Sequence, residues 1–153
     1  MTAFDCGKPA LDIWLTRHAR QALGSGSAKT FIVCDGEHVV GYYSLTVGQV
    51  DTAEVPPRVS KGMGRYPIPV VILARLAVSN SYQGRGIGLA MLRDAIRRTL
   101  TISEQAGIRA LLTHPIDDDA AHFYQRFGFI PSPLRDQQWL LLLKDARRLL
   151  KHL

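Results

Sequence analysis

The chain is poor in cysteine and has no long apolar run. Cys6 and Cys34 are its only cysteines among 153 residues, and they do not form a C-x-x-C pair. Neither a disulfide framework nor a zinc ribbon is therefore supported, and we expect two buried structural thiols and no metal. No stretch of 18 or more apolar residues occurs, and the N-terminus MTAFDCGKPALD lacks a basic start followed by an apolar stretch. We therefore expect a cytoplasmic protein without a membrane segment.

Two common nucleotide-binding motifs are also absent. A dinucleotide fingerprint G-x-G-x-x-G/A fails because a leucine and a methionine stand where its last position would fall, and no G-x-x-x-x-G-K-[ST] run occurs. Gly84, Gly86 and Gly88 nevertheless stand at the start of an apolar helical pattern over residues 86–105. Glycines let a backbone approach an anion, a helix N-terminus attracts it, and Arg85 adds a charge. We expect a pyrophosphate here; a strand-to-helix turn with glycines for packing is the alternative.

The length, hydrophobic content and net charge of the chain restrict its fold class and its partners. A chain of this length with 46% hydrophobic residues predicts one domain over residues 1–153 that builds its core without metals or disulfides. The net charge of +6 favours a polyanionic partner, because each Lys or Arg can neutralise a phosphate.

Hydrophobic periodicity and turn signals predict the order of the elements. The pattern predicts a helix over residues 11–23, a hairpin over 30–47 with a turn at Asp35-Gly36, a basic proline-containing loop over 52–69, a buried strand over 70–78, a helix over 86–105, a strand over 108–115, a helix over 117–128 ended by Gly128, a strand over 138–143 and a basic tail. This order predicts an α/β fold with a parallel strand–helix–strand unit and a ligand at the strand's carboxyl end.

Two segments resemble one enzyme family. The run QGRGIG at residues 83–88 matches the Q/R-x-x-G-x-G/A acetyl-CoA motif of the GNAT N-acetyltransferases, and FYQRFGF at 123–129 resembles their F-Y-x-x-x-G-F segment. Further segments are similar to the TacT-like GNAT toxins of type II toxin–antitoxin modules: TFIV at 30–33, GYYSL at 41–45, RYPIP at 65–69, ARLAV at 74–78 and FIPS at 129–132.

The resemblance implies a fold, an activity and partners. It implies the GNAT fold, α/β (α+β), with a mixed central sheet flanked by helices and splayed central strands that hold acetyl-CoA. TacT-like toxins acetylate the α-amine of the amino acid on charged tRNA, which stops translation and releases CoA. The resemblance also implies a homodimer neutralised by a ribbon-helix-helix antitoxin.

The resemblance also assigns site residues. It places the pyrophosphate on the backbone N–H groups of the motif residues, namely Gln83, Gly84, Arg85, Gly86, Ile87 and Gly88. It places the pantetheine arm against the backbone of Leu76, Ala77 and Val78. Tyr124 takes the position of the catalytic acid that protonates the leaving thiolate. Many GNATs have Asn seven residues before this tyrosine, where this chain has Asp117, whose carboxylate lacks the amide group for the family's contact to the cofactor.

These groups suit acyl transfer to an α-amine. A tyrosine with a reference pKa near 10 is a proton donor at neutral pH, and a thiolate of pKa about 8.5 needs modest help to leave. An α-amine titrates at about 7.7 to 8.0, so it needs little catalysis of its deprotonation. A base is left open: the candidates, which are equally typical of turns and helix starts, are His114, Asp117, Asp118, Asp119 and His122.

Basic residues predict contacts with tRNA phosphates. Arg58, Lys61, Arg65 and Arg75 are expected to border the acceptor site, although a solvated surface charge is the alternative for each. Arg75 lies in an apolar strand, so we expect it to pair with a buried carboxylate or a substrate phosphate. The tail from Lys144 is either tRNA-facing or a terminal helix.

The sequence thus predicts an acetyl-CoA-dependent N-acetyltransferase that acts as a toxin on charged tRNA without an acetyl-enzyme. A GNAT acting on a small amine or a protein N-terminus is a second hypothesis. A non-catalytic CoA-binding interaction module is a third.

Overall fold

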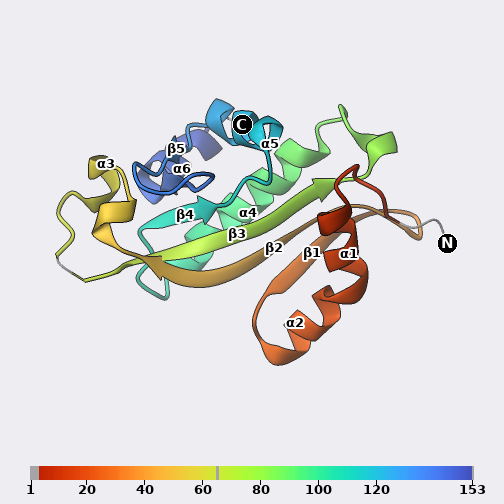
Figure 1. Cartoon of the computed structure of the whole chain (residues 1–153), viewed down its shortest axis with the longest axis horizontal. Helices are drawn as coiled ribbons and strands as arrows, with labels where there is room; N and C mark the ends of the chain where they lie inside the picture. Colours follow the sequence, from red (N-terminus) through yellow and green to blue (C-terminus); the bar gives the residue numbers. More distant parts are fainter. Residues whose placement is uncertain (1–3, 65, 153) are drawn as a thin grey trace. The chain divides into compact units, whose positions relative to one another are not determined.

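The elements follow the predicted alternation. The computed structural model describes residues 4–64 and 66–152. Along the chain they are α1 (Pro9–Arg17), α2 (Ala19–Ser25), β1 (Lys29–Asp35), β2 (His38–Val50), η1 (Thr52–Glu54), α3 (Pro57–Ser60), β3 (Ile68–Val78), η2 (Asn80–Tyr82), α4 (Ile87–Ser103), β4 (Ala110–Thr113), α5 (Asp118–Arg126), β5 (Ile130–Pro131), β6 (Trp139–Leu142) and α6 (Leu143–Leu150) (Figure 1).

The six strands form one mixed sheet in the order β1-β2-β3-β4-β6-β5. The pairs β1/β2, β4/β6 and β5/β6 are antiparallel. β3 and β4 are neighbours joined through α4, and a helical crossover is the connection that parallel neighbours need. The predicted mixed α/β architecture is therefore confirmed. The predicted splay of the central strands stays a prediction.

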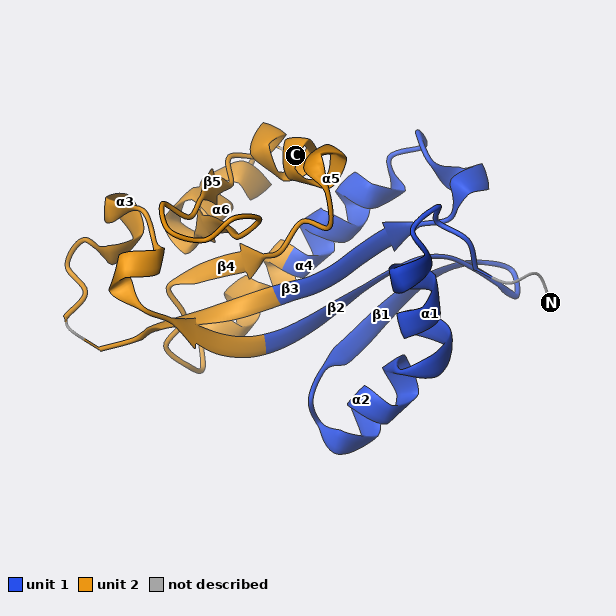
Figure 2. Ribbon diagram, in the orientation of Figure 1, with its two compact units in different colours: residues 1–46, 73–95 blue, residues 47–72, 96–153 orange. Residues whose placement is uncertain are grey.

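The chain divides into two compact units (Figure 2). Unit 1 comprises residues 1–46 and 73–95, and unit 2 comprises residues 47–72 and 96–153. Strands β2 and β3 and helix α4 each contribute residues to both units. A single GNAT domain over residues 1–153 stays a prediction.

In unit 1 the predicted N-terminal helix is two helices. His18, with φ −121° and ψ −22°, separates α1 from α2, and Gly26 ends α2 in the left-handed region at φ 75°. The apolar side of α1 covers a small core of Cys6, Tyr42 and Ala77. The helical spacing of apolar residues was therefore correct, but the break at His18 was missed because no glycine or proline marks it.

The predicted hairpin of unit 1 is confirmed. Asp35 pairs with His38 across the turn, and Gly36 has the positive φ of 60° that the turn requires. Within β2, Gly41 provides room for α4: a Cβ built on it would lie 3.1 Å from Cε of Met91 and 3.3 Å from Cγ2 of Ile87. The first turns of α4 therefore pack directly on the backbone of β2.

In unit 2 the predicted loop over residues 52–69 contains two short helices. The 3-10 helix η1 begins with a capping box between Asp51 and Glu54, and α3 begins at Pro57, a residue favoured at the first helical position. Val59 on α3 is fully buried. It belongs to a hydrophobic core whose other buried members are Val50, Val55, Ile68, Val70, Ala110, Leu112 and Leu140.

The C-terminal part of unit 2 follows the predicted pattern closely. β4 pairs with β6 from Ala110↔Leu142 to Thr113↔Trp139. Helix α5 ends before Gly128, whose φ of 90° suits glycine alone. The basic tail forms helix α6, and the two-residue strand β5 was not predicted. Within residues 4–64 and 66–152, no helix is long and apolar enough to cross a membrane.

The two thiols differ. Cys6 is buried, and burial is the largest cause that raises its pKa to about 11. Cys34 is exposed near the end of the edge strand β1, so the expectation that it is buried was wrong. The physical reason is that one face of an edge strand in an antiparallel pair can remain in water.

Candidate functional site

The glycine loop of unit 1 presents free backbone N–H groups. Gly84 and Gly86 have φ values of 79° and 82°, and a Cβ built on either would meet no atom within 4 Å. Ala90 donates to the carbonyl of Gly86 at 3.0 Å, the first hydrogen bond of α4. The N–H groups of Ile87 and Gly88 therefore precede the helical ladder and point out of the helix N-terminus. The loop leaves open space above a set of aligned donors.

Gln83 fixes this loop to the end of β3. Its Nε2 donates to the carbonyl of Val78 at 3.0 Å, to that of Cys6 at 3.1 Å and to Oδ1 of Asn80 at 3.3 Å. Ser79 donates its backbone N–H to Val40 at 2.8 Å, which extends the pairing of β3 with β2. The side chain of Gln83 therefore has a structural role, and the donors that the loop offers to an anion are backbone groups.

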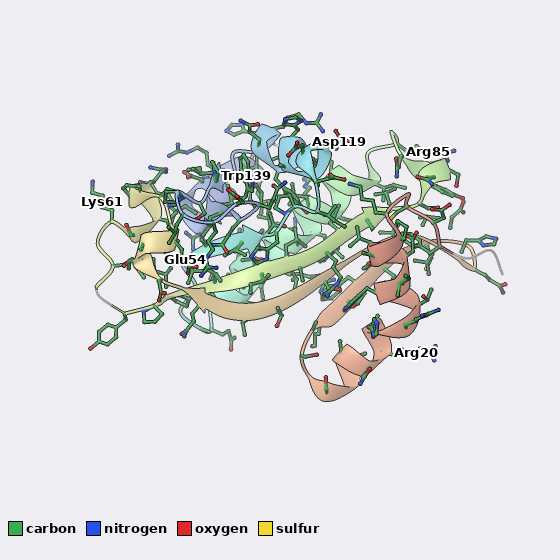
Figure 3. The ribbon with its side chains drawn as sticks, in the orientation of Figure 1. Arg20, Glu54, Lys61, Arg85, Asp119 and Trp139 are labelled. Atoms are coloured by element: carbon green, nitrogen blue, oxygen red, sulfur yellow. The ribbon has the colours of Figure 1, made fainter. Side chains whose placement is uncertain are left out.

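A second contact ties the loop to the hairpin. The hydroxyl of Tyr82 donates to Oδ2 of Asp35 at 2.5 Å, and this hydrogen bond is the largest cause that raises the pKa of Tyr82. Arg85 lies with Cζ 4.7 Å from the centre of the Tyr82 ring, at the outer end of the loop (Figure 3). Arg85 is exposed and pairs with no carboxylate in the described ranges, so its charge is available to an anion.

The loop residues fit a pyrophosphate. A phosphate oxygen needs donors within hydrogen-bond reach and no side chain in the way, and the open positions of Gly84 and Gly86 meet both needs. The predicted pantetheine residues Leu76, Ala77 and Val78 form the last part of β3 and lead directly into this loop. The structure therefore places the predicted cofactor-binding residues at the end of β3 and in the loop that follows it, all within unit 1.

Tyr124 belongs to unit 2 and is buried. Its side chain, on α5, is 5% exposed and packs against the rings of Phe123 and Phe129 at 5.3 and 5.1 Å. Burial is the largest cause that raises its pKa to about 12, and a hydrogen bond with the side chain of Thr113 opposes that effect. Tyr124 is therefore a neutral phenol at physiological pH, with Thr113 as the partner of its hydroxyl.

The three aspartates among the five base candidates lie at the start of α5. Asp117 caps α5, because its Oδ1 accepts the backbone N–H of Ala120 at 2.9 Å. Oδ1 of Asp118 accepts from Gln137 at 3.4 Å, and Asp119 is exposed in the first turn of α5 (Figure 3). The Asp run is thus a helix start.

His114 has a partner that the sequence did not predict. Its Nε2 lies 3.2 Å from Oε1 of Gln138, a residue that is 7% exposed. When Oε1 accepts, the proton of His114 is on Nε2, and Nδ1 is free to accept. Nε2 of Gln138 has no hydrogen-bond partner within residues 4–64 and 66–152. His122 is exposed on α5.

The basic residues predicted to contact tRNA are not all alike. Arg58 pairs with Asp145, with Nη2 to Oδ1 at 2.5 Å, and Lys61 is exposed after α3 (Figure 3). Arg65 lies outside the described residues. Arg75 stacks its guanidinium on Trp14, an aromatic partner that the predicted alternatives, a buried carboxylate or a substrate phosphate, did not include. In the part of the chain that the structure describes, no three His, Cys, Asp or Glu side chains form a group that could hold a metal ion.

Comparisons with known proteins agree with this geometry. A family model described as an acetyltransferase (GNAT) domain matches residues 26–131. The chain is 41% identical over 150 residues, which are 98% of its length and 90% of the relative's, to a tRNA-acetylating toxin of Mycobacterium tuberculosis strain H37Rv. It is similar in structure to a tyrosine-to-phenylalanine mutant of KacT, with a TM-score of 0.89 and 26% identity over 97% of this chain and 90% of that one. It is also similar to AtaT in complex with acetyl-methionyl-tRNAfMet, with a TM-score of 0.88 and 29% identity over 95% and 89% of the two chains.

Proposed function

We propose that this chain transfers acetyl from acetyl-CoA to the α-amino group of aminoacyl-tRNA and so blocks translation. The chain belongs to the GNAT acetyltransferase family. The family predicted from the sequence is confirmed by the match over residues 26–131. The observation that carries the proposed substrate is the 41% identity, over 98% of this chain, to a tRNA-acetylating toxin. AtaT in complex with acetyl-methionyl-tRNA supports the same substrate class.

The proposed setting is a toxin–antitoxin module. Structures of AtaT with the C-terminus of its antitoxin AtaR, and of KacTA with DNA, support an antitoxin as the partner of this chain. We expect a ribbon-helix-helix protein, a homodimeric toxin and action in the cytoplasm, where charged tRNA is consumed.

The glycine loop is the proposed cofactor site. AtaT has been determined with acetyl-CoA, and a pyrophosphate fits the open donors of residues 84–88. Bound acetyl-CoA supplies an acetyl thioester whose thiolate is a good leaving group. The chain contributes the loop N–H groups and Arg85 for the diphosphate, and the backbone of Leu76, Ala77 and Val78 for the pantetheine arm.

Tyr124 is the proposed catalytic residue, and its pKa defines how it acts. Full proton transfer from a phenol of pKa about 12 to a thiolate of pKa about 8.5 is uphill by roughly 5 kcal/mol. The Tyr124 hydroxyl therefore acts best as a hydrogen-bond donor that stabilises the departing sulfur, while the nitrogen of the attacking amine, which loses a proton when it becomes an amide, supplies the proton of the thiol. Structures of tyrosine-to-phenylalanine mutants of KacT and AtaT have been determined, and such a change removes a phenol hydroxyl.

An α-amine acceptor needs little help from a general base. At pH 7 an α-amine of pKa about 7.7 to 8.0 is neutral in roughly one molecule in ten, whereas a lysine of pKa about 10.4 is almost wholly protonated. His114, through Nδ1, is the one base candidate whose ring is both exposed and oriented by a buried partner.

The test is transfer of labelled acetyl from acetyl-CoA to a pool of charged tRNAs, with uncharged tRNA, a polyamine and a peptide as parallel acceptors. Label on charged tRNA alone, released with the amino acid by mild base, is the expected result. Label on the polyamine or peptide alone would instead support a GNAT with another amine substrate. Tyr124→Phe is expected to lower transfer by about 10² to 10³, and wild-type rates in this variant would assign the donor role to another group. No label on any acceptor with the wild-type protein would support a non-catalytic CoA-binding module.

A further inference from the structure

A cavity in unit 2 is lined by an unusual concentration of positive charge. Its volume is 370 Å³, and its lining combines three aliphatic residues with five basic ones: Arg58, Lys61, Arg109, Lys144 and Arg147. These residues come from α3 and the segment after it, from the residue before β4, and from α6. The sequence predicts Arg58 and Lys61 as single tRNA contacts and leaves open whether the tail with Lys144 and Arg147 faces tRNA, but it does not predict Arg109 or a common cavity, because these residues are distant along the chain.

One acidic side chain offsets one of these five charges. Asp145 accepts two hydrogen bonds from Arg58, at 2.5 and 3.1 Å, and Arg58 is the largest cause that lowers the pKa of this carboxyl. Arg109 is held differently, since its Nε and Nη2 donate to the backbone carbonyls of Val59 at 2.9 Å and Lys61 at 3.0 Å. Neutral carbonyls do not cancel the charge of Arg109. The cavity therefore keeps a net charge of about +4, from the five lining cations and Asp145.

The hydrogen bonds of Arg109 make this a built site. They fix the end of α3 to the start of β4, and Leu143 donates its N–H to the carbonyl of Arg109 at 3.2 Å. Three segments distant in sequence thus meet around one ordered arginine. The side chains of Lys61, Lys144 and Arg147 are exposed at its rim.

The cavity and the hydrogen-bond partner of the proposed catalytic tyrosine lie at opposite ends of β4. Arg109 directly precedes β4, and Thr113, the hydrogen-bond partner of Tyr124, ends that strand. Four residues of extended chain span about 13 Å. A substrate whose reacting amine is near Tyr124 therefore needs an anionic group about 13 Å away to reach the cavity, and a nucleic acid carries a phosphate every few ångströms along its chain.

We propose that this cavity binds phosphodiester groups of charged tRNA a few nucleotides from the aminoacylated end. Arg109, Lys144 and Arg147 thereby become tRNA-positioning residues beside Arg58 and Lys61. This inference rests on the proposed function. It extends that function by defining where the RNA backbone is held and by predicting that acceptors too short to reach the cavity lose its contribution.

The test compares two acceptors with two matched variants. Lys144→Gln/Arg147→Gln removes two exposed charges that line the cavity, and Arg148→Gln/Lys151→Gln removes two exposed charges of the same C-terminal segment that do not line it. The acceptors are charged tRNA and the methyl ester of the same amino acid, which has no phosphate. The cavity variant is expected to raise KM for charged tRNA about tenfold at unchanged kcat and to keep the rate with the ester within about twofold of the wild-type rate. The control variant is expected to have KM and kcat close to the wild-type values with both acceptors.

Binding of uncharged tRNA separates this inference from the proposed function. With two phosphate contacts removed, the slope of log K against log salt is expected to fall by about 1.5 in the cavity variant and to stay unchanged in the control. This result would support the site even if wild-type protein acetylated no tRNA, an outcome that would overturn the proposed function alone. Equal losses in both variants, or equal losses with both acceptors, would overturn the site. Retained tRNA binding with lost binding of a Glu-rich peptide would assign the cavity to an acidic protein segment and also overturn the proposal.

Discussion

The guanidinium of Arg75 lies 3.9 Å above the centre of the Trp14 ring. Trp14 in turn stacks on Tyr42, with the two rings 5.9 Å apart and 10° from parallel. Burial is the largest cause that lowers the pKa of Arg75, and the interaction with Tyr42 opposes it. The arginine of an apolar strand is thus accommodated by aromatic faces, since cation–π attraction compensates part of its lost hydration.

Replacing Trp14 is expected to destabilise unit 1. Trp14→Leu removes the cation–π partner of Arg75 and the stacking partner of Tyr42, and the free energy of unfolding should fall by about 1 to 3 kcal/mol. Urea denaturation of the wild-type protein and the variant measures this difference in the free energy of unfolding. Trp14→Tyr keeps an aromatic face and should lose clearly less; equal losses in the two variants would show that side-chain volume, and not the aromatic stack, matters at this position.

The pH dependence of transfer should reflect the substrate and not Tyr124. With a pKa of about 12, Tyr124 stays protonated throughout the range from pH 6 to 9. The rate at low charged-tRNA concentration should therefore rise with an apparent pKa near the 7.7 to 8.0 of an α-amine and then level off. Tyr124→Phe should show the same rise at a lower rate. A decline between pH 8 and 9 that disappears in Tyr124→Phe would contradict this assignment.

Alkaline conditions should destabilise the fold in a defined order. A group whose pKa is raised by folding contributes stability below its unfolded pKa and loses it as the pH rises through the folded value. For Cys6 that range runs from 9.0 to about 11, and for Tyr124 from 10.0 to about 12. Tyr42 is shifted in the same direction by burial. Thermal unfolding at pH 7.5, 9, 10 and 11 should give a falling Tm, and Cys6→Ala should flatten the early part of the decline relative to Cys34→Ala.

Gly41→Ala tests the packing of α4 on β2. The added methyl would lie 3.1 Å from Cε and Sδ of Met91, which is 2% exposed and has little room to move. We expect a loss of about 1 to 3 kcal/mol in the free energy of unfolding. Combining it with Met91→Ala should relieve the contact, so the double variant should lose less than the sum of the single ones. Strict additivity would show that the crowding has another source.

Local patterns predicted the elements but not their long-range partners. The turn at Asp35-Gly36, the run into the glycine loop and the stop at Gly128 follow from residues adjacent in sequence, and the structure has all three. The break at His18 carries no glycine or proline signal, so an uninterrupted apolar stripe predicted one helix.

In the candidate site too, features of neighbouring residues were predicted and contacts between distant residues were not. The glycine loop was predicted because its donors are consecutive backbone groups. Thr113 and Gln138, the partners of Tyr124 and His114, were missed because tertiary packing alone brings them there. Arg58 and Asp145 are 87 positions apart, and no local rule pairs them. Arg75 was expected to pair with a buried carboxylate or a substrate phosphate, and an aromatic face was not considered.

The contrast between the two thiols makes the unmodified chain suitable for site-selective labelling. Cys6 is buried with a pKa of about 11, so alkylating reagents at neutral pH meet almost no thiolate there. Cys34 is exposed and directly precedes Asp35, the residue that accepts a hydrogen bond from Tyr82 beside the glycine loop. A maleimide fluorophore will therefore attach at a single native position next to the proposed acetyl-CoA loop, and it can report cofactor binding without any substitution in the protein.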